Sequence, residues 1–464
     1  MAPGSVSLAS IRRMLEGVIP GVMCTVSRDG TPHLCFLSQA DYVDEEHVAL
    51  SFQFFNRSRQ NILATRRAAL TVDDPYTAGG VRLDLEYLRT ETSGPLFQRM
   101  NAKLAGIASH SGMDKVFRLQ GADIYRVHAV QRIEGRQELA APQPRCELQP
   151  AIRALSEELT ACTDMAQLLD TCMRGLRQHL LIDNAILMVV DARAQRLYTV
   201  ASAGYDSSGV GAEIAFGEGV AGIAAREGVP IRVGHLSLWQ VYGRAMRQGA
   251  IDVGLGLAAQ EEIPLPGLAE PRSQMAVPLR LRGRVEGVLL MESSEDQHFS
   301  YDDEDAVTVI ANQLALQLQL LQPAEAEPVA PAAPAAAANT GPAGSVTSPA
   351  GDSPDGPPAM VRHHAPNDSV FVDGNYLIKG VAGAIFRKVV AEWLASGRTE
   401  FNNRELRLDP ALKLPDVADN LEVRLVLLQR RLADRGGPLR IEKTGRGRFR
   451  IVPLRPLHLE SLQS

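Results

Sequence analysis

A polar turn after an apolar run carries the residues best suited to bind a phosphate group. The apolar run spans Val48 to Phe55, and it is followed by Asn56, Arg57, Ser58, Arg59 and Asn61. Asparagine is a good helix cap, so the pattern predicts a strand that ends near Phe55 and a helix that starts at Arg57. A helix start presents unpaired amide donors and the positive end of the helix dipole. Guanidinium and hydroxyl groups add donors there, so we expect Arg57, Ser58 and Asn61 to bind a cofactor phosphate.

The strands that must position this turn are indicated just upstream. Residues 21–27 and 31–37 flank Asp29-Gly30, which is a strong signal for a hairpin turn. Three residues near the turn are placed by position alone to contact a cofactor ring: Gln53 and Phe54 at the strand end, and His33 on the neighbouring strand. The alternative is that the arginines form an exposed basic helix face without a ligand.

The segment resembles the pyridoxamine 5'-phosphate oxidase-like, FMN-binding split-barrel family over about residues 8–135. The likeness rests on residues 56–63 and 65–70, which stand where that family has its flavin-phosphate turn and short helix. Ser58 stands where lysine is usual and Arg66 where proline is usual, and Arg59 lies beside Ser58 to supply the missing charge. The resemblance implies an all-β split barrel with short helices over residues 1–140 that binds FMN. Some members of this family bind haem or a deazaflavin coenzyme, so both cofactors are alternatives to FMN.

Cofactor binding does not by itself indicate turnover. No residue in the sequence fixes a substrate, so catalytic residues stay unassigned. An FMN-dependent oxidoreductase is therefore an alternative reading of the same segment.

Length and composition bound the remaining possibilities. A chain of 464 residues predicts two to four domains, and 45% hydrophobic with 22% charged residues is ordinary for soluble globular protein. The five cysteines show no CxxC pattern and no histidine at metal-ligand spacing, which indicates reduced thiols in the cytoplasm and no metal site. No apolar run approaches the roughly 20 residues that span a bilayer, so no membrane contact is expected.

Two breaks divide the chain. Residues 323–360 are rich in alanine and proline and offer little to bury, which predicts a disordered linker. A shorter proline-containing break lies at residues 140–145. We therefore expect domains at residues 1–140, 146–322 and 361–456.

The middle segment resembles a GAF domain. Three stretches carry the resemblance: residues 217–225 with 228–232, residues 273–279 and residues 287–292. It implies an α+β domain that binds a small molecule under a covering segment or that dimerises. The expected lid spans residues 235–272 and contains His235, Trp239 and Tyr242. These residues contact a ligand or simply pack the lid onto its sheet. The identity of the ligand is not assigned. Apolar stripes on residues 148–178 and 302–321 indicate a homodimer seam.

The segment after the linker has a different charge. Residues 361–464 hold 18 Lys plus Arg against 12 Asp plus Glu, whereas the other 360 residues hold 30 against 42. A basic segment on an acidic chain indicates an anionic partner.

This basic segment is expected to be a small α+β winged helix. Helices are indicated near residues 384–394, 402–406 and 419–433, and a hairpin near 439–452. Residues 429–432 and 444–449 resemble the output domains of two-component response regulators. Such a domain places its third helix in the major groove of DNA and its wing on the backbone. The expected DNA-binding residues are Arg424, Arg431, Arg435, Lys443, Arg446 and Arg448. A protein-binding surface and a solvated basic face are the alternatives.

Taken together, the modules predict a cytoplasmic sensor. A cofactor or ligand state in the first two domains would control engagement of DNA by the third. The competing hypotheses are an FMN-dependent oxidoreductase regulated by its GAF domain and a cofactor-free dimeric interaction scaffold.

Overall fold

The structure is a computed structural model in two compact units. It describes residues 6–16, 19–37, 39–52, 57–111, 119–135, 138–139, 144–236, 263, 265–321, 357–365, 368–412, 421–445 and 447–462. One unit comprises Met1–Ala161, Asp170–Gln260 and Pro264–Ala315, and the other holds the carboxyl-terminal residues. Residues 322–356, which hold most of the expected linker, and most of the expected lid lie outside the described residues. The linker boundary expected at residue 360 is corrected, because Ala359 and Met360 already belong to a strand. None of the described helices combines the length and the apolar composition needed to span a bilayer.

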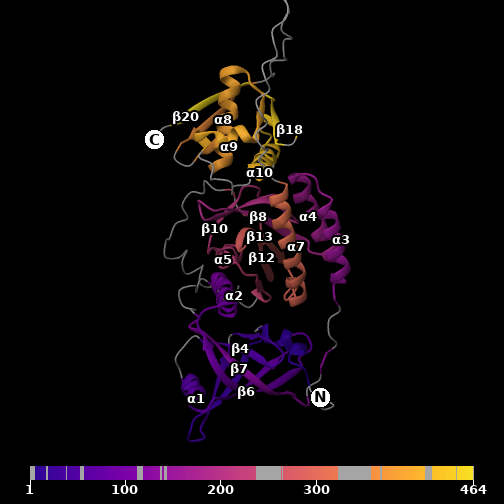
Figure 1. Cartoon of the computed structure of the whole chain (residues 1–464), viewed down its shortest axis with the longest axis vertical. Helices are drawn as coiled ribbons and strands as arrows, with labels where there is room; N and C mark the ends of the chain where they lie inside the picture. Colours follow the sequence, from indigo (N-terminus) through magenta and orange to yellow (C-terminus); the bar gives the residue numbers. More distant parts are fainter. Residues whose placement is uncertain are drawn as a thin grey trace, which may run out of the picture. The chain divides into compact units, whose positions relative to one another are not determined.

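The amino-terminal domain is a curled antiparallel sheet with strand order β2-β1-β5-β6-β7-β4-β3 (Figure 1). Its strands are β1 (Gly21–Val26), β2 (Pro32–Leu37), β3 (Ala40–Tyr42), β4 (His47–Phe52), β5 (Arg67–Asp73), β6 (Gly80–Glu91) and β7 (Gly121–Arg132). Its helices are η1 (Ala9–Glu16), α1 (Arg57–Thr65) and α2 (Pro95–Ser111). The expected hairpin around Asp29-Gly30 is confirmed, and α1 connects β4 to β5. Alternating apolar residues, including Leu50, Leu70 and Leu83, form the core of this sheet.

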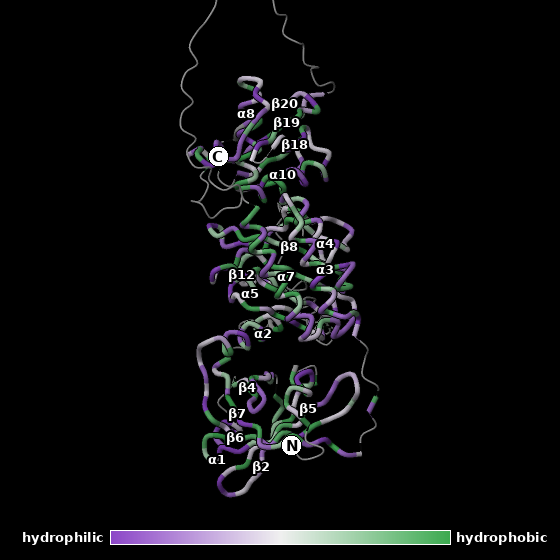
Figure 2. The backbone as a smooth tube through the Cα atoms, turned by 45° about the vertical axis from the view of Figure 1, so that its right-hand side comes forward, coloured by the Kyte–Doolittle hydropathy of each residue, from purple (hydrophilic) through white to green (hydrophobic). Residues whose placement is uncertain are grey.

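The central domain is a six-stranded antiparallel sheet with order β10-β9-β8-β13-β12-β11. Its strands are β8 (Asn184–Asp191), β9 (Arg196–Ala203), β10 (Glu213–Ala215), β11 (Ile231–Val233), β12 (Ser273–Leu281) and β13 (Arg284–Ser293). Its helices are α3 (Leu148–Thr160), α4 (Met165–Leu180), α5 (Gly219–Glu227) and α7 (Tyr301–Leu320). In both Figure 1 and Figure 2, α5 lies on one side of α7, and α3 and α4 lie on the other. The stretches at residues 273–279 and 287–292 lie in β12 and β13, and the apolar stripe expected at residues 302–321 corresponds to α7.

The apolar stripe over residues 148–178 suggested one helix, but the structure has two. The side chain of Asp164 accepts a hydrogen bond from the amide of Gln167 at 2.9 Å, which starts α4 as a new helix. The two helices then pack closely, since a Cβ at Gly175 would lie 2.2 Å from Leu155 Cδ1. A helical hairpin therefore replaces the single long helix.

Helix α2 packs on both the amino-terminal and the central domain. Leu96, Met100 and Leu104 belong to a buried cluster with Ile124 of β7. On another face, Ala102 belongs to the buried cluster that contains the apolar residues of α5. The expected boundary at residue 140 therefore marks a sequence break but does not separate two independent cores.

The carboxyl-terminal domain contains a four-stranded sheet, β16-β15-β14-β20, and a three-stranded sheet, β17-β19-β18. The strands are β14 (Ala359–His364), β15 (Ser369–Val372), β16 (Asn375–Ile378), β17 (Glu400–Asn402), β18 (Leu439–Gly445), β19 (Arg448–Pro453) and β20 (Leu457–Leu462). The helices are α8 (Gly380–Ser396), α9 (Asn403–Leu408), η2 (Pro410–Leu412) and α10 (Leu421–Asp434). The expected helices and basic hairpin are present. The four-stranded sheet was not expected from the sequence, and its strand β20, which pairs in parallel with β14, lies beyond the expected boundary at 456.

Candidate functional site

The start of α1 is fixed against the first hairpin. Ser58 is buried, and its hydroxyl donates to Cys35 Sγ at 3.2 Å. The buried side chain of Asn61 donates from Nδ2 to Thr25 Oγ1 at 3.2 Å. Arg57, the first residue of the helix, is exposed. Of the three residues expected to hold a phosphate, Arg57 is thus the one that presents its side chain to solvent.

The side chain of Arg59 is buried in the amino-terminal domain. It is 8% exposed, pairs with Asp123 of β7, and donates to Thr90 Oγ1 at 2.7 Å. Its guanidinium lies 4.3 Å from the ring centroid of Phe52. Burial raises the pKa of Asp123, although the neighbouring Arg59 and Thr90 act in the opposite direction. The expectation that Arg59 makes up for the missing lysine is therefore corrected, because an internal carboxylate already holds it.

The residues expected beside a cofactor ring are only partly described. His33 is half-buried on β2 and lies opposite Thr25 in the hairpin register. Because side chains alternate along a strand, His33 and Cys35 share one face of β2, and Cys35 contacts Ser58 of α1. The structure therefore brings His33 to the side of the hairpin that carries α1. Gln53 and Phe54 lie outside the described residues.

A hydrogen-bonded cluster, the Glu292 cluster, lies at one end of the central sheet and consists of the buried residues Gln274 and Glu292 and the half-buried residues Tyr205 and Leu268. Glu292 is 6% exposed and accepts hydrogen bonds from Tyr205 Oη at 3.1 Å, Gln274 Nε2 at 2.6 Å and the Leu268 amide at 2.9 Å. Burial, followed by the Glu292 carboxylate, raises the pKa of Tyr205. Glu292 thus holds the loop after β9 and the segment before β12 on the same strand end.

This cluster was not expected from the sequence. Its one available signal was Glu292, an acidic residue that follows the apolar stretch Gly287–Met291. An acidic side chain at the end of a buried strand needs hydrogen-bond partners. The partners come from residue 205 and from residues 268–274, so spacing along the chain could not identify them.

Of the three expected lid residues, only His235 is described. It lies after β11 and is 7% exposed. Burial, with a smaller contribution from Lys103, lowers the pKa of His235 to about 4, so the ring is neutral at pH 7. Among the described residues, His235 Nδ1 has no hydrogen-bond partner. Trp239 and Tyr242 lie outside the described residues.

Two of the expected DNA-contacting arginines are buried. Arg424 is 5% and Arg431 is 4% exposed, and Arg431 donates from Nε to the carbonyl of Leu377 at 2.9 Å. Helix α10 packs against α8, α9, β16 and β18, so most of its surface faces protein. The expectation that Arg424 and Arg431 form an exposed stripe is corrected for this reason.

The other basic residues of this segment lie on the surface. Arg435 follows α10, and Lys443 and Arg448 lie on the β18–β19 hairpin; all three are exposed. Arg446, in the hairpin turn, lies outside the described residues. The structure therefore shifts the exposed basic groups from the third helix to the hairpin.

The fold and these sites define a multidomain protein built around a GAF domain. Residues 164–318 match the family model of the GAF domain, and this part of the chain is a GAF domain. The match covers α4, α5, the six-stranded sheet and α7 up to residue 318, and α3 lies before it. No curated protein matches the chain.

Three solved structures illustrate the similarity. The GAF domain from an Acinetobacter phosphoenolpyruvate-protein phosphotransferase is 20% identical, covers 36% of this chain and 90% of its own, and has a TM-score of 0.30. Free methionine-R-sulfoxide reductase from Neisseria meningitidis is 20% identical, covers 39% and 92%, and has a TM-score of 0.29. An FMN-binding protein from Syntrophomonas wolfei is 14% identical, covers 27% and 86%, and has a TM-score of 0.23.

Proposed function

We propose that the chain is a sensor protein in which FMN binds the amino-terminal domain, a small molecule binds the GAF domain, and the carboxyl-terminal domain contacts DNA. The observation that carries this proposal is the start of α1. Arg57 is exposed there, while Ser58 and Asn61 fix the same turn to the first hairpin. A helix start with an exposed arginine suits a phosphate because the amides, the helix dipole and the side-chain charge act together.

The Glu292 cluster supports the sensory role of the GAF domain. Its carboxylate accepts bonds from both the loop after β9 and the segment before β12. A ligand that offers a stronger donor to Glu292 would compete with these bonds and free the two segments. Ligand binding would then change the conformation of both segments, which is what a sensor domain requires.

The basic β18–β19 hairpin supports contact with an anionic partner. Lys443 and Arg448 are exposed on adjacent strands, and Arg435 is exposed at the end of α10. Their charges suit the DNA backbone, which supplies affinity without reading sequence. Because Arg424 and Arg431 are buried, the proposed contact is made by the hairpin.

The test of the flavin site is the absorption spectrum of the purified chain, followed by titration with FMN. We expect a flavin spectrum, and an Arg57→Ala variant should bind FMN roughly tenfold or more weakly because a charge-assisted phosphate contact is lost. Arg82→Ala removes an exposed arginine from β6 of the same domain and should leave FMN affinity unchanged.

Three other outcomes decide against parts of this assignment. A Soret band would indicate haem in place of flavin, and a spectrum that fits only a deazaflavin would indicate that coenzyme. A colourless protein that takes up no FMN would remove the flavin sensor and the flavin-dependent oxidoreductase together. Equal FMN affinity in Arg57→Ala and the unaltered chain would move the phosphate away from α1.

A second candidate function, a dimeric interaction scaffold, is favoured by the outer face of β1 and β2. Phe36 is 81% and Leu34 is 64% exposed, and Val22 and Val26 are exposed on the neighbouring strand. The register pairs Val22 with Phe36, so these apolar side chains form one patch. Exposed apolar patches of this kind mark interaction surfaces. We propose that the patch joins two copies of the chain, whether or not the domain binds a cofactor.

A further inference from the structure

Strand β12 has a free edge in its second half. Strand β11 pairs with β12 only over Gln274–Ala276, whereas β13 pairs with it along its full length. Among the described residues, no strand lies beside residues 277–281 on the β11 side. The edge of the sheet is therefore open between the end of β11 and the β12–β13 turn.

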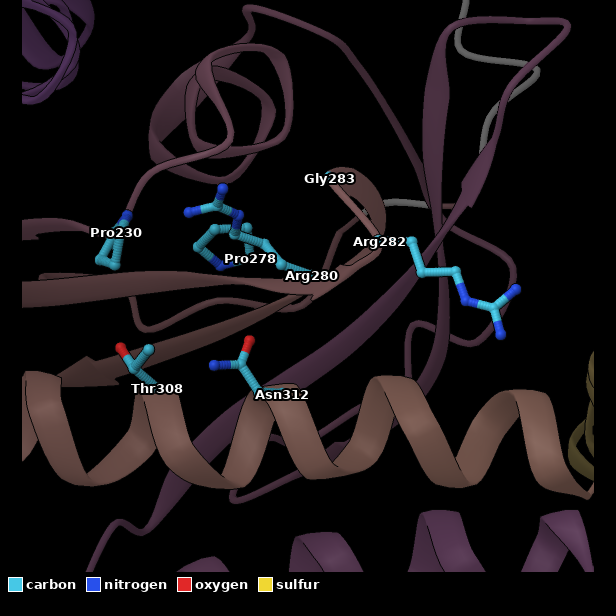
Figure 3. A pocket seen from close by; sticks show the side chains of 7 residues that line it. All are labelled: Pro230, Pro278, Arg280, Arg282, Gly283, Thr308 and Asn312. Carbon is cyan, nitrogen blue, oxygen red and sulfur yellow. The ribbon is translucent and has the colours of Figure 1, made fainter. Parts of the chain in front are cut away.

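A groove of about 310 Å³ lies at this open edge. It is lined by Pro230, Pro278, Arg280, Arg282, Gly283, Thr308 and Asn312 (Figure 3). Figure 3 shows Thr308 and Asn312 projecting from α7 toward the strand, Arg280 lying over Pro278, and Arg282 extending away from the turn. The volume is at the lower end of the range for small-molecule sites, roughly 300–1,000 Å³.

The charged residues that line the groove are all positive. Two guanidinium groups line it and no carboxylate does. Within the described part of the chain, no hydrogen bond or ion pair involves the side chain of Arg280, Arg282 or Asn312. Asn312 adds an amide with two donor hydrogens, whereas the hydroxyl of Thr308 already donates to the carbonyl of Glu304 at 2.7 Å. The groove therefore offers an excess of donors and two uncompensated positive charges.

The turn that carries Arg282 provides a second observation. Leu281 pairs with Arg284, so Arg282 and Gly283 form a two-residue turn, with φ of 49° and 79°. Such a turn favours Asn-Gly, because both residues need positive φ. An arginine in the left-handed region is less stable than a residue that tolerates this conformation. The turn places Arg282 beside the groove, with its side chain extending away from it in this structure.

We propose that the groove between the β12 edge and α7 binds a small anion with at least two negative charges, carried by phosphate or carboxylate groups. Arg280 contacts the anion within the groove, and the flexible side chain of Arg282 swings in from the turn. Asn312 donates from the α7 side. Arginine suits this task because its planar fork donates two parallel hydrogen bonds to either group. The site lies outside the Glu292 cluster and shares no residue with it.

The test is calorimetric titration of the full chain with pyrophosphate and, separately, with citrate. We expect at least one of them to bind, and Arg280→Ala should weaken binding roughly ten- to hundredfold, as expected for a lost hydrogen bond between charged groups. Binding of pyrophosphate alone identifies a phosphate site, and binding of citrate alone identifies a carboxylate site. Binding of both pyrophosphate and citrate identifies a site that recognises negative charge irrespective of the group that carries it.

Two further variants separate binding from folding. Arg282→Asn creates the preferred Asn-Gly turn, so it should keep or raise the melting temperature while lowering anion affinity. Arg284 lies in the same hairpin but outside the groove, and its Nε atom is 3.8 Å from Glu286 Oε1. The Arg284→Ala variant should therefore bind the anion with unchanged affinity. Failure of both probes to bind overturns the proposal. An equal loss of anion affinity in Arg284→Ala also overturns it, because that result would indicate a diffuse basic surface. A change of oligomeric state in Arg280→Ala with unchanged anion affinity overturns it as well.

Discussion

At the scale of the residue, two arginines that are two positions apart in α1 have opposite environments. Arg57 is exposed, whereas Arg59 is buried against Asp123, Thr90 and the rings of Phe52 and Tyr87. The acceptor that decides this difference is 64 positions away in the chain. Composition around the turn therefore indicated its basic character, but not which arginine is available to a ligand.

The buried pair predicts a large local loss of stability in an Arg59→Leu variant. Removing one partner leaves the carboxylate of Asp123 buried and uncompensated, which typically costs about 3–5 kcal/mol. The measurement is hydrogen exchange of the amides in α1 and β7, since it reports local opening within a multidomain chain. Arg57→Leu, at the exposed position, should change the same amides by less than about 0.5 kcal/mol. Equal effects of the two variants would contradict the structural role of Arg59.

At the scale of the element, the hairpin of β1 and β2 has one face exposed to solvent and one face covered by the protein. Strand β2 alternates between exposed and covered residues, with Leu34 and Phe36 outside and Cys35 and Leu37 inside. The inner face anchors α1 through Cys35, and the outer face is apolar and uncovered in a single chain. One hairpin therefore supports both the candidate cofactor turn and the proposed dimer surface.

Light scattering should give the mass of a dimer for the full chain, and Phe36→Asp should convert it to a monomer, because a charge would have to be buried in the apolar contact. Leu408→Asp is a matched control at a residue that is 71% exposed in α9. Leu316→Asp tests the alternative seam on α7, where Val309, Leu316 and Leu320 are exposed. A monomeric unaltered chain, or dissociation only in Leu316→Asp, would contradict the β1–β2 surface.

The elements themselves were largely predictable, and their packing was not. The Asp29-Gly30 turn, the helices near residues 384–394 and 419–433, and the hairpin at 439–452 each follow from local turn chemistry and apolar periodicity. The division of residues 148–169 into two helices depends on one capping aspartate. The pairing of β14 with β20 joins segments nearly 100 positions apart. The groove beside β12 depends on where β11 ends, which local patterns do not specify.

At the scale of the whole molecule, the described chain contains four sheets but three regions with distinct charge and chemistry. The amino-terminal and GAF regions share α2, and the carboxyl-terminal region carries the exposed basic hairpin. With a net charge of −6 over the 464 residues, the proposed attraction to DNA would have to come from this local basic surface. The acidic remainder would restrict binding to that surface.

We expect the full chain to bind duplex DNA with an affinity that falls steeply with salt. Lys443→Ala and Arg448→Ala should each lower the slope of log affinity against log salt by about 0.9, because each removes one phosphate contact. Arg362→Ala is the control, since Arg362 lies on β14 of the other sheet and pairs with Glu460. Salt-independent or absent binding would favour a protein partner for this domain.

The parallel pairing of β14 with β20 has a consequence for how the chain matures during synthesis. Strand β14 opens the carboxyl-terminal domain, but its neighbour from Leu457 to Leu462 is made only after all other strands of the domain. Until then, β14 presents one unpaired backbone edge, which is a template for unwanted strand pairing. A product that stops before residue 457 would keep that edge open, so proteolytic quality control could distinguish it from a chain that includes β20.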